Sequence, residues 1–405
     1  MKKTILLLTF LLLLAGTSMP ISAQEDSKIV QLKELSNTVK QNHAPDRRSR
    51  LFEVTFKANA AEEGVVYVVK GVTTEVDAKE ALLAAAANEG ITLVDSVKLL
   101  PDSALGDKIF GITSLGTTFV RSSPSHSAEM DTQTLMGMPL RILEKRGTWA
   151  RVVTPEGYIS WMHIGAELMT KEEVAEWNKA DKVVITTHYT LFRAQPEPSA
   201  AVVREGVWGC IAKADGEEGD YFKVRLPDGK SAYVPKTDAQ KFEEWLNQRD
   251  PNAQNLIATG KQFVGFPYMW GGTSTKGVDC SGFVKSCFYL NGVIIPRDAS
   301  QQVRAGEEVD ISNIVENLQP ADLVFFGSKA KDDAPERITH VGMYIGNGRF
   351  IHSNGTWASV TIESLLPDQP DYTKTAESLI RVKRYIHLID KDKDIVSISK
   401  HPWYT

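Results

Sequence analysis

Hydrophobic and polar residues in the first hundred positions alternate between a helical spacing and a strand-like spacing. Apolar residues recur every three or four positions in residues 29–39, and Pro45 ends this pattern. A strand, a second strand, an alanine-rich helix and a third strand are predicted at residues 51–57, 64–70, 74–88 and 91–100. We expect a small α/β unit with a packing or spacing role, because no catalytic motif is recognised in it.

Short strand-like runs separated by turns replace this pattern from residue 118 onward. The first set predicts strands and then a helix at residues 134–141, 149–153, 157–159 and 171–179. A looser repeat of the same plan predicts strands at residues 208–213, 221–226 and 231–234. Two small β-barrels are therefore expected, and a helix predicted at residues 238–245 leads into the last part of the chain.

The last part of the chain opens with a helical stripe at residues 253–264, which we interpret as core packing. Further on, Asp279 and Cys280 precede an apolar stretch with near-helical spacing that reaches Leu290. Asp279 is a favourable N-cap residue, so Cys280 is expected in the first turn of a helix. Unpaired N–H groups and the helix dipole favour a thiolate there, which predicts a lowered pKa for Cys280.

Two histidines downstream lie on patterns that predict neighbouring strands. The apolar run after His340 and the run that contains His352 are separated by Asn347-Gly348, which is a strong hairpin signal. In such a hairpin His340 and His352 can lie close together. A nucleophilic thiol needs a base, and the base needs an orienting group, so the pattern predicts a Cys–His–His site.

The N-terminus has the organisation of a secretory signal. Lys2 and Lys3 precede an apolar run, and Ser22-Ala23 ends a small-residue cleavage site. The apolar run is too short to span a membrane, and no cysteine follows it to carry a lipid anchor. The net charge of −5 is mild and predicts no basic face for nucleic acid.

The chain has three cysteines, an odd number for an exported protein. Cys287 follows Cys280 by two helical turns, about 10 Å, which is too far for a disulfide. Cys210 can pair with Cys280 only if its domain packs there, so that disulfide is the alternative to a free catalytic thiol. No two cysteines have zinc-ligand spacing, and neither a metal nor a cofactor is expected.

Several motifs in order resemble the NlpC family of bacterial cell-wall cysteine peptidases over residues 256–385. These motifs are Tyr268 to Gly272 (YMWGG), Asp279 to Phe283 (DCSGF), Pro296-Arg297, Asp322 to Phe326, His340 to Gly342, Asn347-Gly348 and Ile351-His352. Ala321 departs from the glycine usual before Asp322. The resemblance implies an α+β, papain-like domain, in which the helix that bears Cys280 packs on an antiparallel sheet. It also implies Cys280 as nucleophile, His340 as general base and acid, and His352 as the residue that orients His340.

Residues 118–124 resemble the start of a bacterial SH3-like repeat, and residues 157–162 resemble its closing GYxGWV motif, with departures at Ser160 and Met162. The expected organisation is a signal peptide, an N-terminal α/β unit, two SH3-like domains, a peptidase domain and a tail, at residues 1–23, 24–117, 118–180, 181–240, 241–390 and 391–405.

Similar proteins with two SH3-like repeats before an NlpC-type domain cleave murein peptides between γ-D-glutamate and the diamino acid, and they require a free N-terminal L-alanine. The resemblance implies that Asp279, Tyr158 and Glu129 hold the amino group, and that Ser281 and Ser300 line the same pocket. Each of these three residues also has a simpler interpretation. Asp279 can be only an N-cap, Tyr158 only a core residue of the barrel, and Glu129 only a solvated charge in a loop.

The expected reaction is amide hydrolysis through an acyl-enzyme at Cys280. The Cys280 backbone N–H is an expected oxyanion donor, and Tyr268 either assists it or packs beside Trp270. We expect an exported monomer, periplasmic or extracellular, with murein stem peptides or peptidoglycan as its partner. The open alternatives are an endopeptidase that acts on intact peptidoglycan through wall-binding SH3-like domains, a non-catalytic wall-binding protein, and transacylation, for which related proteins place His before Cys.

Overall fold

The computed structural model describes residues 26–61, 64–332 and 334–404, which fall into two compact units. The first unit holds the described residues up to Pro45 together with Phe52–Lys98, and the second holds Asp46–Leu51 and the chain from Leu99 onward. The predicted signal peptide at residues 1–23 lies outside the described residues. In the described ranges no helix is long and apolar enough to cross a membrane.

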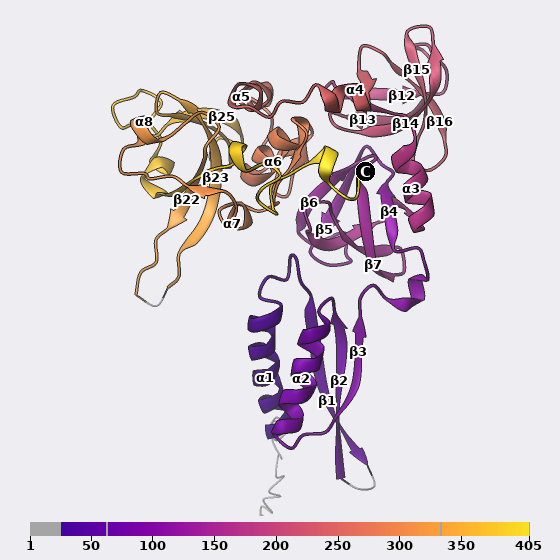
Figure 1. Ribbon diagram of the computed structural model, residues 1–405, viewed down its shortest axis with the longest axis vertical. Coiled ribbons are helices and arrows are strands. Elements are labelled where there is room, and N and C mark those ends of the chain that lie inside the picture. Colours follow the sequence, from indigo (N-terminus) through magenta and orange to yellow (C-terminus); the bar gives the residue numbers. More distant parts are fainter. Residues whose placement is uncertain (1–25, 62–63, 333, 405) are drawn as a thin grey trace, which may run out of the picture. The chain divides into compact units, whose positions relative to one another are not determined.

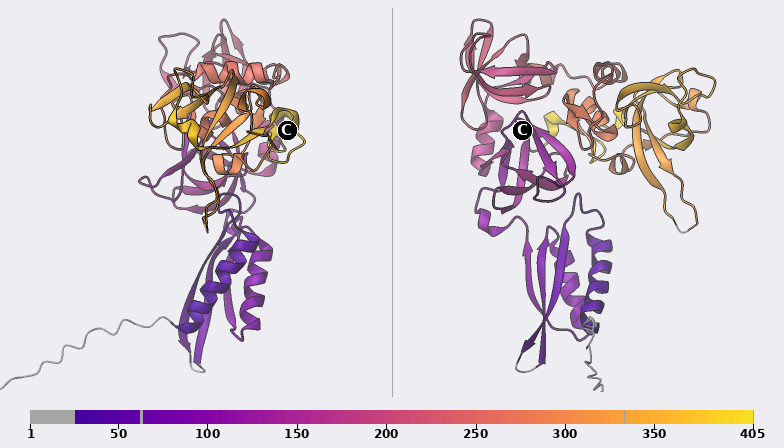
Figure 2. Two further views of the ribbon diagram at one scale, coloured as in Figure 1. Left: turned by 90° about the vertical axis from the view of Figure 1, so that its left-hand side faces the viewer. Right: turned by 180° about the vertical axis from the view of Figure 1, so that it is seen from behind.

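Two helices cover one face of a three-stranded sheet in the first unit (Figures 1 and 2). Their elements are α1 (Ser27–His43), β1 (Phe52–Ala61), β2 (Gly64–Thr73), α2 (Val76–Asn88) and β3 (Leu93–Leu99). The Asp26 side chain caps α1 by accepting a hydrogen bond of 2.8 Å from the Lys28 N–H. The helices and strands predicted here are confirmed, with ends that shift by a few residues.

A seven-stranded antiparallel sheet opens the second unit. Its order is β10-β4-β7-β8-β9-β5-β6. The strands are β4 (Phe110–Thr113), β5 (Thr117–Arg121), β6 (Met130–Leu135), β7 (Pro139–Arg146), β8 (Trp149–Val153), β9 (Ile159–His163) and β10 (Ala166–Met169). Leu140, Val152 and Met162 are among its core residues. The sheet begins at Phe110, before the strand pattern recognised at residue 118, because β4 pairs with both β7 and β10.

A second seven-stranded sheet repeats the topology of the first. Its order, β13-β12-β16-β15-β14-β11-β17, is the same order read in reverse, with β11 in the place of β4 and β17 in the place of β10. The strands are β11 (Lys182–Ile185), β12 (Tyr189–Arg193), β13 (Val202–Val207), β14 (Ile211–Glu218), β15 (Tyr221–Arg225), β16 (Ser231–Pro235) and β17 (Ala239–Lys241). The predicted internal repeat is therefore present in the fold.

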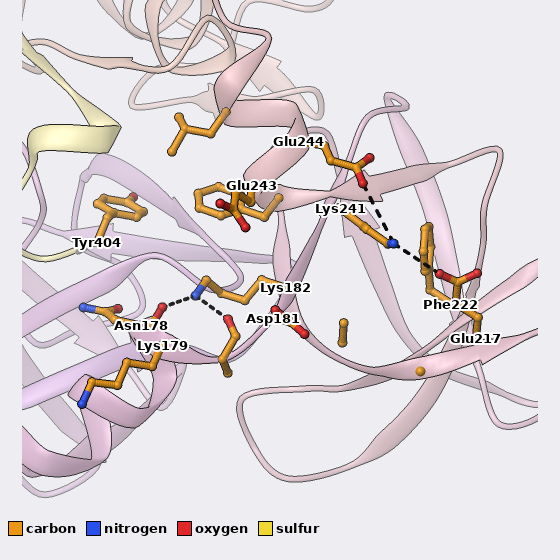
Figure 3. A pocket seen from close by; sticks show the side chains of 15 residues that line it. Asn178, Lys179, Asp181, Lys182, Glu217, Phe222, Lys241, Glu243, Glu244 and Tyr404 are labelled. Carbon is orange, nitrogen blue, oxygen red and sulfur yellow. Dashed lines mark hydrogen bonds and ion pairs between the residues drawn. The ribbon is translucent and has the colours of Figure 1, made fainter.

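Short helices flank the second sheet. α3 (Lys171–Lys179) has the predicted bounds and begins with a capping box between Thr170 and Glu173. The helix predicted at residues 238–245 begins too early. Residues 239–241 pair with β11 as strand β17, and the helix α4 covers Phe242–Asn247. A pocket of about 530 Å³ lies beside these elements (Figure 3). In it Lys182 donates to the carbonyl groups of Trp177, Asn178 and Ala180 at the end of α3.

The C-terminal region is a six-stranded antiparallel sheet with helices packed against it. Its order is β21-β26-β22-β23-β24-β25. The elements are α5 (Ala253–Gln262), α6 (Cys280–Leu290), α7 (Ala299–Gln302), β21 (Glu307–Glu308), α8 (Ile314–Asn317), β22 (Leu323–Ser328), β23 (Arg337–Gly346), β24 (Arg349–Asn354), β25 (Ser359–Ser364) and β26 (Leu379–Arg384). Strands β23 and β24 form the predicted hairpin, with φ of 53° at Asn347 and 72° at Gly348.

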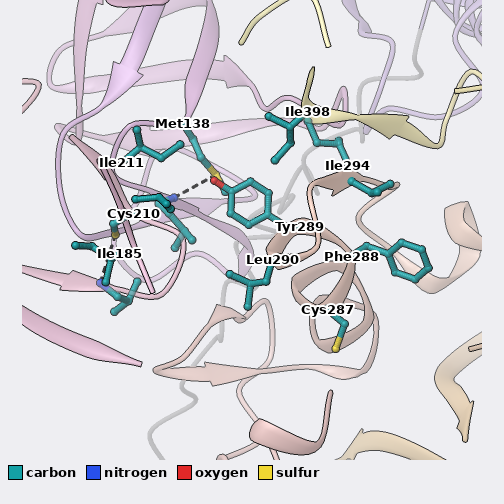
Figure 4. Packing of buried hydrophobic residues seen from close by; sticks show 14 of the residues in the cluster. Met138, Ile185, Cys210, Ile211, Cys287, Phe288, Tyr289, Leu290, Ile294 and Ile398 are labelled. Carbon is teal, nitrogen blue, oxygen red and sulfur yellow. Dashed lines mark hydrogen bonds between the residues drawn. The ribbon is translucent and has the colours of Figure 1, made fainter. Parts of the chain in front are cut away.

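One hydrophobic core joins the three parts of the second unit (Figure 4). Tyr289 and Leu290 of α6 pack with Ile211 and Cys210 of the second sheet and with Met138 of the first. The Tyr289 hydroxyl donates to the Gly209 carbonyl at 3.1 Å. The tail also joins this core, because β27 (Val396–Ser397) pairs with β20 (Val293–Ile294). Helix α6 thus packs against both seven-stranded sheets and the C-terminal tail. All three cysteines are free, which excludes the disulfide alternative.

Candidate active site

Cys280 is the first residue of α6, as the sequence predicts. The Asp279 carboxylate caps this helix by accepting a hydrogen bond of 2.7 Å from the Gly282 N–H. Gly282 lies directly against the Gly272 carbonyl, and a Cβ at position 282 would overlap that oxygen. A glycine at position 282 is therefore required for the loop at 271–272 to approach the first turn of α6.

His340 on β23 and His352 on β24 are direct hydrogen-bond partners, which confirms the predicted juxtaposition. The distance between His340 Nε2 and His352 Nδ1 is 2.7 Å. His352 Nε2 lies 2.8 Å from Glu363 Oε2 on β25, and all three side chains form one chain of hydrogen bonds. His352 is fully buried, and Glu363 is nearly so.

This chain of hydrogen bonds fixes the protons on both imidazoles. Burial opposes ionisation of Glu363, but hydrogen bonds from His352 and Trp357 hold its pKa below the usual range. A carboxylate only accepts, so His352 carries its proton on Nε2 and presents Nδ1 as an acceptor. His340 must then donate from Nε2, and its Nδ1 is left with a free lone pair. His340 therefore has the tautomer that a general base requires.

Burial sets the protonation of the thiol and the imidazole. It raises the pKa of Cys280 to about 12, with a further contribution from the nearby Asp279 carboxylate. Burial also lowers the pKa of His340 to about 3, and His352 adds to this effect. The predicted lowering of the Cys280 pKa is thus wrong, because burial outweighs the helix terminus. The Cys280 sulfur accepts a hydrogen bond from the Val341 N–H, beside His340.

Glu363 is a residue of the site that the sequence analysis missed. Its second oxygen accepts a hydrogen bond of 2.7 Å from the indole N–H of Trp357. His352 pairs with Thr361 across the β24–β25 ladder, so Glu363 stands two residues further along the same face of β25. No motif marks this position, and only the strand register could have located it.

A pocket of about 600 Å³ is lined by Cys280 and by all six predicted substrate-binding residues. The predicted residues in its wall are Glu129, Tyr158, Tyr268, Asp279, Ser281 and Ser300. The wall also contains residues that the sequence analysis did not predict to bind substrate: Arg47, Arg48, Asp131, Trp270, Asp298, Ala299, Arg337, Ile338 and Thr339. The pocket therefore combines the first sheet, the segment at residues 46–51 and the C-terminal region.

The Asp279 carboxylate is committed to the protein itself. The fully buried Arg297 forms a bidentate pair with it, with distances of 3.1 and 2.6 Å. Gly271 and Gly282 N–H groups also donate to Asp279, at 2.9 and 2.7 Å. Arg297 further donates to Thr132 of the first sheet. This geometry favours the N-cap interpretation of Asp279 over a direct bond to a substrate amine.

Three other carboxylates meet around Tyr158. The Tyr158 hydroxyl lies 3.3 Å from Asp298, and Asp131 accepts a hydrogen bond of 2.5 Å from Ser160. Burial raises the pKa of Asp131, and the charges of Glu129 and Asp298 raise it further. A cluster of this kind is stabilised by a bound cation. Asp131 lies on β6 and Glu129 directly precedes that strand, so the available signal was two acidic residues close together at a strand start.

Tyr268 lies in the Tyr268-to-Gly272 motif that precedes Cys280, and it lines the same pocket. Burial raises the pKa of its hydroxyl, and the neighbouring Cys280 and Asp279 raise it further. Tyr268 is therefore a neutral phenol that can donate a hydrogen bond.

A cysteine at a helix N-terminus, next to a histidine pair with fixed tautomers, defines the chain as a thiol hydrolase. The sequence model of the NlpC/P60 family matches residues 265–376, and that of the bacterial dipeptidyl-peptidase Sh3 domain matches residues 120–166. The chain belongs to the NlpC/P60 family, and it is a cysteine peptidase of the peptidoglycan-hydrolysing class.

Similar proteins support this placement. The gamma-D-glutamyl-L-lysine dipeptidyl-peptidase of Bacillus cereus is 33% identical over 270 residues, which cover 65% of this chain and 77% of that protein. The dipeptidyl-peptidase 6 of Lysinibacillus sphaericus is 27% identical over 271 residues, which cover 64% and 93%. The crystal structure of an NlpC/P60 family protein from Bacillus cereus has a TM-score of 0.58 at 26% identity, covering 68% of this chain and 99% of that one.

Proposed function

We propose that this enzyme hydrolyses the γ-D-glutamyl–diamino acid bond of murein stem peptides that have a free N-terminal L-alanine. The product would be the dipeptide L-Ala-D-Glu. The observation that carries this proposal is the acidic cluster of Glu129, Asp131 and Asp298 around Tyr158, in the same pocket as Cys280. A desolvated ammonium needs such carboxylates, and a neutral amide does not.

The mechanism follows from the tautomers of the two histidines and is of the papain-like type. His340 Nδ1 takes the proton from the Cys280 thiol as the sulfur attacks the γ-carbonyl carbon of D-glutamate. The imidazolium of His340 then gives this proton to the amine of the leaving diamino acid. Water, deprotonated by His340, attacks the thioester and releases the dipeptide with restoration of the thiol. The Cys280 N–H and the Tyr268 hydroxyl are the proposed oxyanion donors.

The first sheet is proposed to contribute to catalytic specificity and not only to wall attachment. Asp131 lies on β6, Glu129 and Tyr158 directly precede β6 and β9, and all three line the pocket that contains Cys280. The shared strand order supports an SH3-like assignment for the second sheet as well. We further propose that residues 1–23 direct export and are removed, so that the enzyme acts in the periplasm or outside the cell.

The second candidate function is an endopeptidase that acts on intact peptidoglycan, with the SH3-like domains as wall-binding modules. It requires an open end of the pocket through which the glycan-linked peptide can leave. The side chains of the first sheet that line the pocket favour the enzyme for free peptides.

A digest of two matched substrates tests the proposal. The mature protein is incubated with L-Ala-γ-D-Glu-diaminopimelate and with the same peptide joined to muramic acid, and the products are identified by mass spectrometry. Cleavage of the free peptide alone supports the proposal. Equal cleavage of both substrates would support the wall endopeptidase, and Cys280→Ala protein serves as the control for contaminating activity.

A further inference from the structure

The segment at residues 46–51 is part of the second unit, although it joins α1 to β1 of the first unit in sequence. Its backbone attaches to the first sheet, because the Ile159 N–H donates to the Arg48 carbonyl at 2.7 Å. A tight turn closes on the Asp46 carbonyl, which accepts hydrogen bonds of 3.0 Å from both the Ser49 and Arg50 N–H groups. This turn presents Arg47 and Arg48 to the pocket that contains Cys280.

The Arg48 guanidinium joins two sets of residues. One terminal nitrogen donates to Asp298 and to Ser300, at 2.8 Å each. The Nε and the other terminal nitrogen donate to the two oxygens of Asp46, at 2.7 Å each. This fork geometry is the strong, orientation-specific kind of arginine–carboxylate pair. Arg48 therefore fixes the position of Asp298, the residue that also contacts the Tyr158 hydroxyl.

Carboxylates outnumber guanidinium groups at this end of the pocket. Glu129, Asp131 and Asp298 line it, and Asp46 pairs with Arg48, whereas the cations are Arg47 and Arg48. Arg47 lies close enough to Asp131 to lower its pKa, against the effect of burial. The excess of negative charge suits a positively charged ligand. Asp279 and Arg297 neutralise each other and do not change this balance.

We propose that residues 46–51 form the end wall of the subsite for the substrate's amine, and that Arg48 is a specificity-determining positioning residue. This inference rests on the proposed function. The wall holds Asp298 toward the ammonium of an N-terminal L-alanine and leaves no room for an acyl group on that nitrogen. An N-acylated peptide is therefore rejected twice, because it lacks the balancing charge and contacts the wall.

Binding measured by calorimetry tests the wall separately from turnover. The ligands are L-Ala-γ-D-Glu-diaminopimelate and its N-acetyl form, and the proteins carry Cys280→Ala so that neither ligand is cleaved. The reference protein should bind the free peptide more tightly than the acetylated one. In Arg48→Ala this preference should fall at least about tenfold, because Asp298 loses its fixed position and the wall opens. Arg304→Ala is the matched control, since Arg304 pairs with Asp46 from an exposed position away from the pocket wall.

The outcomes separate the two claims. The end wall would be overturned if the preference for the free peptide is unchanged in Arg48→Ala, or if Arg304→Ala loses it equally. In either case, turnover of the free peptide by the enzyme that retains Cys280 would still support the proposed function. Equal binding of both peptides by the reference protein would overturn the wall outright, as would binding of neither. If Arg48→Ala does not fold, Arg48→Lys carries the test, because it keeps the charge but cannot bridge Asp46 and Asp298.

Discussion

Glu363 Oε2 lies 2.8 Å from Nε2 of His352, and this single contact determines which nitrogen of His340 is free to accept a proton. The catalytic histidine is thus oriented by a carboxylate that it does not touch, through a second imidazole. The arrangement extends the expected Cys–His–His site by one residue.

Replacing Glu363 by glutamine should lower kcat about 100-fold with little change in KM. The amide can donate to His352 Nε2, which favours the opposite tautomer and removes the acceptor for His340. Steady-state kinetics with the free peptide measure the effect. Glu336→Gln is the control, because Glu336 pairs with Arg381 on the surface of the same domain. An unchanged kcat in Glu363→Gln would remove this residue from the relay.

Cys280→Ala should abolish turnover and leave the fold intact. The substitution removes the only nucleophile that the mechanism provides, while the side chain of alanine fits the space of the thiol. Mass spectrometry of the digest and the thermal unfolding midpoint are the two measurements. Cys287→Ala is the matched control, because Cys287 is a buried cysteine of the same helix that plays no part in the mechanism. Retained cleavage in Cys280→Ala would contradict the cysteine-peptidase mechanism.

The fall of kcat on the acid side of its pH profile should have its midpoint well below the ordinary pKa of histidine. His340 acts as a base only when neutral, and burial lowers its pKa to about 3. A lowered pKa keeps the imidazole neutral as the pH falls, so kcat should stay nearly constant from pH 7 to about pH 5. Stopped assays across this range at saturating peptide measure it. A fall of kcat with a midpoint near pH 6.5 would mean that His340 is not held in the environment described here.

KM for the free peptide should rise on both sides of neutral pH. On the acid side, burial raises the pKa of Asp131, so its negative charge is lost at a higher pH than for an ordinary aspartate. On the basic side, the substrate ammonium loses its proton at about pH 8. Asp131→Asn should raise KM about tenfold at neutral pH with kcat preserved, and it should remove the acid rise. Asp215→Asn, which alters an exposed pair on the second sheet, should match the unmodified enzyme.

Arg297→Met should lower the free energy of unfolding by about 3–5 kcal/mol, because it leaves the Asp279 carboxylate buried without its cation. Arg297 is only 1% exposed and connects Asp279 with Thr132 of the first sheet. Urea unfolding followed by tryptophan fluorescence measures the change. Arg381→Met, at an exposed ion pair, should cost less than about 1 kcal/mol. If both variants lose similar amounts of unfolding free energy, the buried Arg297–Asp279 pair contributes no more to stability than an exposed pair.

The features that sequence analysis predicted correctly depend on short stretches of chain. The cap of α6 by Asp279 and the hairpin that joins His340 to His352 are each specified within about a dozen residues. Local backbone preferences and one turn signal suffice for such features. The bounds of α3 and the repeated strand plan of the two sheets were also predicted.

The features that the analysis missed depend on the tertiary arrangement. Arg48 reaches Asp298 across 250 residues of sequence, and no local pattern connects them. The error in the Cys280 pKa has the same origin, because the degree of burial around a thiol is set by segments that are distant in sequence. The pairing of Arg297 with Asp279 is also set by the tertiary arrangement, because in the sequence Arg297 stands out only as part of the Pro296-Arg297 motif.

The hydrophobic core that α6 shares with both β-sheets limits how this enzyme can be divided or recombined in evolution. Excision of the peptidase domain alone would expose Tyr289 and Leu290 to water and would remove one wall of the pocket. Exchange of the first sheet for another SH3-like domain would therefore have to replace both a packing surface and the residues of that sheet that line the pocket. The domains of this enzyme are separate in sequence, but the peptidase domain depends on the first sheet for part of its core and part of its pocket.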